Sequence, residues 1–167
     1  IAKSRGVTTT TVLLSVYSLI LRKWSNNKDF TLNLTMLNRE YSKYDIDKVV
    51  GDFTGITLLD CKDDYGLTFF NYAKELQETL IENLEHSAFS GIEVIRAISS
   101  SRNTNNIIMP YVFTSGIGFS KDLNYNYVGR MNDKIRSQTP QVFIDCQCMD
   151  DKDCLRVFFD VRNGIFD

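Results

Sequence analysis

The strongest constraint on the fold is a change of hydrophobic period near the start of the chain. Residues 8–24, TTTTVLLSVYSLILRKW, repeat their apolar side chains with a helical period, whereas residues 29–37, DFTLNLTML, alternate apolar and polar side chains. These periods predict an amphipathic helix, with Thr8 as its N-cap, followed by a half-buried strand. Such a pair must bury its apolar sides by packing a helix against a sheet.

The rest of the chain repeats these two patterns. We expect strands over residues 53–61, 107–115, 141–149 and 155–162, and helices over 67–84 and 90–102, with Ser90 capping the second helix. The short DDKD turn makes the last two strands an antiparallel hairpin. The order predicts a single domain over residues 1–167 of the α/β (α+β) class, a two-layer sandwich with a mixed sheet and helices on one face.

Composition excludes several classes of function. The 167 residues carry a net charge of −2 without a dense Lys and Arg cluster, which disfavours a nucleic-acid surface, and the longest apolar run is too short to span a bilayer. The cysteines are Cys61, Cys146, Cys148 and Cys154, and His86 is the only histidine. We therefore expect buried free thiols, no metal site, no membrane partner and a cytoplasmic location.

Three strand-like segments carry polar residues where core is expected: GDFTGITLLD (51–60), MPYVFTSG (109–116) and SQTPQVFIDCQ (137–147). In the last segment, alternation places Asp145 on one face and turns Cys146 toward the core. A carboxylate held in a cleft can act as a general acid/base, and the hydroxyl of Thr114 can orient it if the two strands are near neighbours. The alternative is a solvated face that carries a surface charge.

Ordinary enzyme motifs are missing from the sequence. A Ser-His-Asp or Cys-His arrangement would have to use His86, which ends a predicted helix and follows no nucleophile-elbow sequence. The chain has no P-loop, and its GIGF segment is too short for a dinucleotide fingerprint. A stand-alone acyltransferase would need a histidine with an aspartate a few residues later, but SAFSG follows His86. That alternative lacks its base.

The polar segments resemble the later motifs of a known family. GDFT (51–54), PYVFTS (110–115) and SQTPQVFID (137–145), in this order, are similar to motifs of the heterocyclization domain of nonribosomal peptide synthetases, a variant of the condensation domain. The segment LNLTMLNRE and the first helix fit the same order. The resemblance covers nearly the whole chain.

The resemblance implies an architecture and a reaction. Such domains have two lobes, each like chloramphenicol acetyltransferase, with a tunnel between them to which carrier proteins bring thioester substrates on a phosphopantetheine arm. The family joins an acyl donor to the amine of Cys, Ser or Thr and then cyclodehydrates the product to a thiazoline or oxazoline. The implied partners are carrier proteins and the N-terminal lobe, and no cofactor is implied on the chain itself.

The resemblance also implies roles for individual residues. Thr114 and Asp145 match the threonine and aspartate that the family links to cyclodehydration, and they are the expected catalytic pair. The expected supporting or tunnel-lining residues are Ser115, Gln141, Gln147, Asp52 and Thr54.

The sequence departs from the family pattern at several points. Cys146 stands where histidine is common, Tyr111 replaces a small valine, and the closing Leu-Phe-Pro run fades at NGIFD. Because no first-lobe signature precedes these motifs, we expect the C-terminal lobe alone, inactive in isolation. The alternative is a non-catalytic lobe that serves as tunnel wall and docks a carrier protein. The proximity of Thr114 to Asp145 distinguishes the two.

Overall fold

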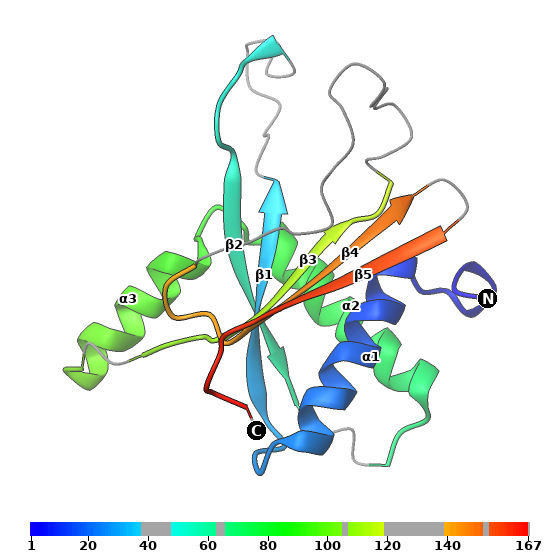
Figure 1. Ribbon diagram of the computed structural model, residues 1–167, viewed down its shortest axis with the longest axis horizontal. Coiled ribbons are helices and arrows are strands. Elements are labelled where there is room, and N and C mark those ends of the chain that lie inside the picture. The colour runs from blue at the N-terminus through cyan, green and yellow to red at the C-terminus, as the bar shows by residue number, and fades with distance from the viewer. Residues whose placement is uncertain (38–47, 63–65, 105–106, 119–138, 152–153, 167) are drawn as a thin grey trace.

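The computed structural model describes residues 1–37, 48–62, 66–104, 107–118, 139–151 and 154–166, which form helices and one sheet (Figure 1). The helices are η1 (Lys3–Arg5), α1 (Thr9–Trp24), α2 (Phe69–Glu85) and α3 (Gly91–Arg102). The strands are β1 (Phe30–Leu37), β2 (Thr54–Cys61), β3 (Tyr111–Gly116), β4 (Ile144–Asp151) and β5 (Cys154–Val161).

The five strands form one mixed sheet in the order β2-β1-β3-β4-β5. The central pairs β1–β3 and β3–β4 are parallel, whereas both outer pairs, β1–β2 and β4–β5, are antiparallel. The predicted α+β class and the antiparallel last hairpin are confirmed. Because β3 pairs with β1, Thr35 and Thr114 become neighbours although they are 79 residues apart in the sequence.

Helix α1 begins where the sequence predicts it. The Thr8 side chain accepts a hydrogen bond from the backbone N–H of Thr11 at 3.0 Å, which satisfies one of the free donors at the helix start. The buried side of α1 also carries small hydroxyl residues, and the Ser18 hydroxyl lies 2.8 Å from the Tyr72 hydroxyl of α2. Such small side chains let the two helices approach closely.

The hydrophobic core lies between the sheet and helices α1 and α2. We call the side of the sheet that faces these helices the core face. It carries Leu32, Leu34, Leu59, Cys61, Phe113, Ile144, Cys146 and Cys148. Leu14, Tyr17 and Leu21 of α1 and Tyr72 and Leu76 of α2 pack against it. The ring of Tyr17 stacks on that of Phe113, with centroids 6.1 Å apart.

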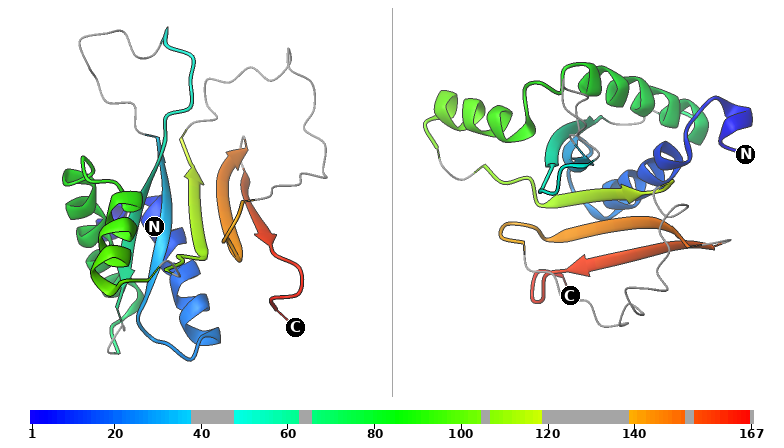
Figure 2. Two further views of the ribbon diagram at one scale, coloured as in Figure 1. Left: turned by 90° about the vertical axis from the view of Figure 1, so that its left-hand side faces the viewer. Right: turned by 90° about the horizontal axis from the view of Figure 1, so that it is seen from above.

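Helix α3 lies beside the edge strand β2, at the side of the molecule opposite β5 (Figure 2). It begins with a capping box in which Ser90 and Glu93 exchange hydrogen bonds, as the prediction of Ser90 as cap requires. A Cβ atom on Gly91 would lie 3.0 Å from the backbone oxygen of Ile56. The missing side chain of Gly91 therefore allows this close approach.

The sheet is only partly covered. Leu155, Val157, Phe159 and Val161 of β5 point to the core face but remain 43–56% exposed. Among the described residues, α1 and α2 therefore cover the sheet from β2 to β4 and leave the apolar side of β5 open. None of the helices in the described ranges is long and apolar enough to cross a membrane.

Three expectations need correction. Strand β3 begins at Tyr111 rather than at Ile107, because Pro110 has no N–H to donate to a neighbouring strand. Strand β4 begins at Ile144 rather than Gln141, because residues 139–142 form a turn in which the Val142 N–H donates to the Thr139 carbonyl. Pro140 followed by Gln141 at φ +69° is the pattern of a type II turn. Cys154 is exposed, whereas Cys61 and the remaining two cysteines are buried and free as expected.

Some predicted segments lie wholly or partly outside the described residues. They are most of the loop after β1, the end of the NTNN turn, most of the glycine-containing loop after β3, and Lys152 and Asp153 of the DDKD turn.

The core predicts how one substitution changes stability. Leu59→Ala removes a fully buried side chain and should lower the free energy of unfolding by about 2–5 kcal/mol, from lost burial plus the cavity left behind. Urea unfolding followed by circular dichroism measures this. Ile81→Ala, at a side chain that is 48% exposed, is the control and should change stability by roughly 0.5 kcal/mol. Equal losses in both variants would contradict this packing.

Thiol burial predicts the order of modification. In native protein, a disulfide reagent should modify Cys154 rapidly and the other three cysteines only after unfolding, because their buried thiols are inaccessible to the reagent. Mass spectrometry of the modified protein counts and locates the labels. The Cys154→Ser variant is the control and should remain unlabelled until denaturant is added. Rapid labelling of that variant would contradict the arrangement.

Candidate active site

Strand alternation gathers polar side chains on the face of the sheet opposite the core, which we call the site face. It carries Thr35 of β1, Thr114 of β3, Asp145 and Gln147 of β4 and Asp160 of β5. The register places Thr114 directly beside Thr35 and beside Gln147, and it places Asp145 directly across from Asp160. Four strands thus bring these five side chains together on one face, in two adjacent rows.

Hydrogen bonds connect four of these residues. The Gln147 amide donates to Asp145 Oδ2 at 2.8 Å, and Thr114 Oγ1 lies 3.4 Å from Asp145 Oδ1 and 3.0 Å from Thr35 Oγ1. Thr114 has one hydroxyl proton, so it donates to either Asp145 or Thr35 at a given moment. The chain Thr35–Thr114–Asp145 can therefore reverse its direction when Asp145 gains or loses a proton.

The environment of Asp145 favours its protonated form. Partial burial raises the pKa of this carboxyl above its usual range, the hydrogen bonds from Gln147 and Thr114 act to lower it, and the charge of Asp160 raises it further. The balance is a raised pKa. A carboxyl group with a raised pKa can hold and deliver a proton nearer neutral pH than an exposed aspartate can.

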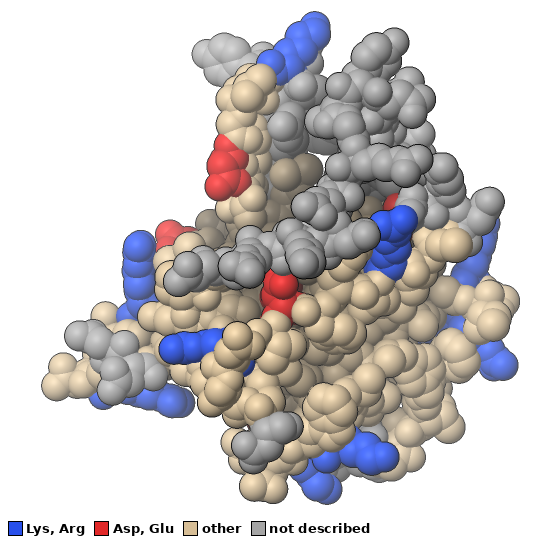
Figure 3. Space-filling model, viewed as in Figure 1, with Lys and Arg blue, Asp and Glu red and all other residues tan. Residues whose placement is uncertain are grey.

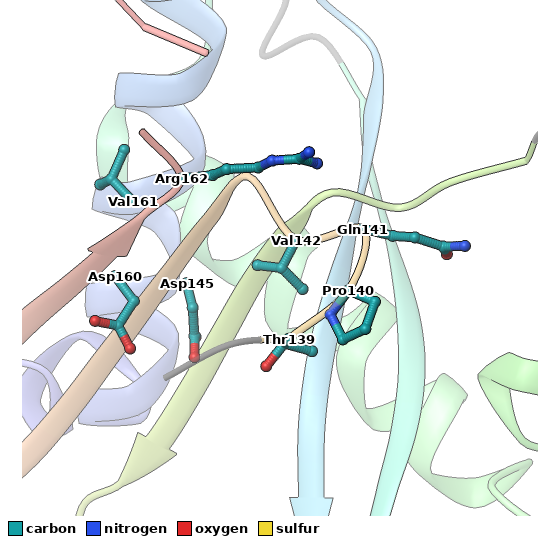
Figure 4. A pocket seen from close by; sticks show the side chains of 8 residues that line it. All are labelled: Thr139, Pro140, Gln141, Val142, Asp145, Asp160, Val161 and Arg162. Atoms are coloured by element: carbon teal, nitrogen blue, oxygen red, sulfur yellow. The ribbon is translucent and has the colours of Figure 1, made fainter. Parts of the chain in front are cut away.

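Asp145 and Asp160 line a pocket of about 480 Å³ (Figure 4). Its other lining residues are Thr139, Pro140, Gln141, Val142, Val161 and Arg162. Figure 4 shows the two carboxylates side by side and directed the same way, while the side chains of Gln141 and Arg162 extend away from them. A volume of this size is within the usual range for small-molecule sites.

The supporting residues expected from the sequence fall in different places. Gln147 contacts Asp145, whereas Gln141 lies in the turn before β4 and lines the pocket without sharing the strand. Ser115 points to the core face, where its hydroxyl lies 3.1 Å from that of Thr10 on α1. Asp52 caps the start of β2 by accepting from the Thr54 N–H, and β1 separates this strand from Thr114.

Three residues of the site face were not expected from the sequence. Thr35 contacts Thr114, Asp160 faces Asp145, and Asn33 carries a buried Oδ1 without a hydrogen-bond partner among the described residues. The alternation of β1 already puts Asn33 and Thr35 on one face. What the sequence does not reveal is that β1 lies beside β3, which brings this face next to Thr114.

Cys146 lies on the core face, as the alternation predicts. A hydrogen bond with Cys148, burial and neighbouring charges together raise the pKa of the Cys146 thiol, and the same hydrogen bond lowers the pKa of Cys148. Tyr17 of α1 lies close enough for Cys146 to act on its hydroxyl, whose pKa rises mainly through burial. Cys146 therefore cannot replace a histidine that would act in the pocket on the opposite side of the sheet.

The charge distribution agrees with the composition. In the view of Figure 3, Lys and Arg side chains lie scattered over the face and form no continuous basic patch. Within the described part of the chain, no group of three His, Cys, Asp or Glu side chains is arranged to hold a metal ion. His86 is exposed at the C-terminal cap of α2, away from the strands that form the site.

Sequence comparison identifies the family. Residues 1–161 match the Condensation domain family. The chain belongs to the condensation-domain family. It is 36% identical over 166 residues to pyochelin synthetase PchF of Pseudomonas aeruginosa (strain PAO1) and 35% identical over 169 residues to phenyloxazoline synthase MbtB of Mycobacterium tuberculosis (strain H37Rv). Both alignments cover 99% of this chain, but only 9% and 12% of those proteins.

A solved structure gives the same result. The chain superposes on the EpoB NRPS cyclization-docking bidomain of Sorangium cellulosum with a TM-score of 0.81 and 29% identity, covering 99% of this chain and 34% of that one. The predicted resemblance to heterocyclization domains of nonribosomal peptide synthetases is thereby confirmed. The chain spans about a tenth of the length of the curated relatives, so the activity of a whole protein is a matter of proposal.

The raised pKa of Asp145 predicts how stability depends on pH. Because its charged form is disfavoured in the folded state, Asp145 contributes most favourably below its unfolded pKa of about 3.9, and this contribution is lost as pH rises through the folded pKa. Asp145→Asn should therefore raise Tm near pH 7, and the difference from wild type should shrink as pH falls toward about 4.

Thermal unfolding across this pH range measures the effect. Asp60→Asn, which neutralises an exposed carboxylate on the same face of β2, is the control for the change in net charge. An Asp145→Asn variant that is less stable than wild type at pH 7 and equal to it at low pH would contradict the raised pKa.

Proposed function

We propose that this chain is the C-terminal lobe of a heterocyclization domain, which condenses carrier-bound acyl or aminoacyl thioesters with Cys, Ser or Thr and cyclodehydrates the product to a thiazoline or oxazoline. The observation that carries the proposal is the Thr114–Asp145 pair, joined across β3 and β4 at 3.4 Å with Asp145 in a pocket. The names of two relatives, phenyloxazoline synthase and cyclization-docking bidomain, support the same reaction type.

Cyclodehydration requires two proton transfers, one to the leaving hydroxyl and one from the ring nitrogen. After the side chain has closed the ring, the intermediate carries a hydroxyl on the carbon next to the ring nitrogen. Protonated Asp145 gives its proton to that hydroxyl, the C–O bond breaks with its electron pair leaving in water, and the nitrogen lone pair forms the C=N bond. The N–H proton then returns to the Asp145 carboxylate, so the residue is regenerated.

Thr114 suits the role of orienting Asp145. Its hydroxyl can accept from the carboxylic acid before Asp145 releases its proton and donate to the carboxylate afterwards, because Thr35 is available to take or supply the other hydrogen bond. Gln147 holds the second carboxylate oxygen. With both oxygens held, the carboxyl group has one preferred orientation toward the pocket.

The same site bears on the alternative that this lobe is only a scaffold. A lobe that served only as tunnel wall would not need a desolvated carboxyl group fixed by two side chains, so the arrangement favours catalysis. The expected partners are carrier proteins, which bring substrates on the phosphopantetheine arm, and the N-terminal lobe. The chain alone is expected to be inactive, and a cytoplasmic location remains a prediction.

Substitutions in the full-length protein test the assignment. Asp145→Asn should lower the rate of cyclodehydration about 10²–10⁴-fold, the usual contribution of a general acid/base, while amide formation continues and the open-chain product accumulates. Thr114→Val should cost about 10²-fold through loss of orientation, and Thr114→Ser should recover most of it. Mass spectrometry of the products separates the two steps, because the cyclized product lacks one water.

The neighbouring hydroxyl provides a matched control. Ser115→Ala removes a hydroxyl one residue away but on the core face, and it should leave ring formation close to the wild-type rate. Undiminished cyclization in Asp145→Asn would refute the proposed role of that residue.

A further inference from the structure

We propose that Asp160 is a positioning residue for cyclodehydration: its carboxylate, across the β4–β5 pairing from Asp145, holds the proton on Asp145 until the leaving hydroxyl takes it. The proposal rests on the proposed function of Asp145 and adds a residue that acts through it. It concerns the side of Asp145 that Thr114 and Gln147 do not occupy.

The geometry places the two carboxylates together. Asp145 and Asp160 are directly paired in the antiparallel register of β4 and β5, so their side chains leave the same face of the sheet as nearest neighbours. Both line the same pocket, and Figure 4 shows them side by side with their carboxylates directed the same way. Like charges in this position destabilise the sheet, and one proton on the pair removes the repulsion.

The hydrogen bonds indicate which of the two carboxyl groups holds the proton. The acid form of Asp145 can donate to Thr114, whose own hydroxyl then donates its hydrogen bond to Thr35, while the other oxygen of Asp145 still accepts from Gln147. A proton placed on Asp145 therefore fits a network that is already present. Asp160 then remains charged beside it and opposes the loss of that proton.

Other charged and titratable groups near Asp145 are few among the described residues. On the site face, β3 and β4 offer the uncharged Thr114 and Gln147, and β5 offers Asp160. Arg156 lies on the same face of β5, but it pairs with Met149, four residues along β4 from Asp145. Arg162, which follows β5, lines the same pocket, but its side chain extends away from both carboxylates in Figure 4. Behind the sheet, Cys146 and Tyr17 are neutral because burial and neighbouring groups raise the pKa of both.

The sign of the effect follows from Coulomb repulsion. The negative charge of Asp160 adds to burial in raising the pKa of Asp145, so its removal lowers that pKa. If protonated Asp145 is the active form, the rate of cyclodehydration falls as pH rises through its pKa. Asp160→Asn should then move this descending limb to lower pH. At a pH above the descending limbs of both proteins, the rate of Asp160→Asn should therefore fall below that of wild type.

The experiment measures the pH–rate profile of ring formation in the full-length protein for wild type, Asp160→Asn and Asp160→Glu. The expected result is a shifted limb in Asp160→Asn, equal rates at low pH, and restoration of the profile in Asp160→Glu. Asp60→Asn removes the same charge from the same face, three strands away from β4, and should leave the profile unchanged. In this chain, carboxyl ¹³C NMR of Asp145, assigned through Asp145→Asn, should show the same shift in its titration.

Each contrary result has a distinct meaning. An equal loss of rate at every pH in Asp160→Asn, with an unshifted Asp145 titration, would show a merely structural residue and overturn the proposal. An unchanged titration together with a strong loss of activity in Asp145→Asn would overturn the role of Asp160 and leave the proposed function intact. A shifted titration with full cyclization in Asp145→Asn would overturn the proposed function and, with it, the role of Asp160.

Discussion

The arrangement of the site depends on the position of strand β3, which pairs in parallel with β1 on one side and β4 on the other. This pairing places the Thr114 hydroxyl between Thr35 and Asp145, at 3.0 and 3.4 Å. Parallel neighbours cannot be joined by a tight turn, so the chain must travel through β2, α2 and α3 between β1 and β3. Helix α2 of this connection also covers the core, so one long connection contributes to both the core and the site.

Adjacent residues of β3 and β4 point to opposite faces of the sheet and therefore have different roles. Thr114 and Asp145 point into the site, whereas their immediate neighbours Ser115 and Cys146 point to the core face. The residue after the proposed acid/base is therefore free to change as long as it fits the core, and a cysteine packed near Tyr17 does so. This departure from the family pattern therefore lies on the opposite side of the sheet from the proposed site.

Local patterns predicted most of the fold, because helix and strand periods are properties of short segments. They gave α1 with its Thr8 cap, the Ser90 cap of α3, the last hairpin and the buried side of β4. They missed the start of β4, because the residues of the Pro140–Gln141 turn also fit the alternating polar and apolar pattern of a strand. They also missed Thr35 and Asp160, since partners across strands depend on the register. The partner of Asp145 depends on the length of the loop between β4 and β5. If all four residues of DDKD formed the loop, residue 158 would lie opposite Asp145. Because Asp151 already pairs with Cys154, Asp160 lies there instead.

The site also explains why sequence alone left Asp145 ambiguous. A charge on an alternating strand is compatible with a wet face, and only its surroundings distinguish the two cases. Here the carboxyl group is half-buried, opposite another carboxylate, and next to a turn in which the non-glycine Gln141 adopts a positive φ of 69°. Burial of a charge, like-charge pairing and a left-handed backbone each cost stability, yet all three meet at one pocket. Unfavourable features that gather in this way are characteristic of a functional site rather than of a solvated surface.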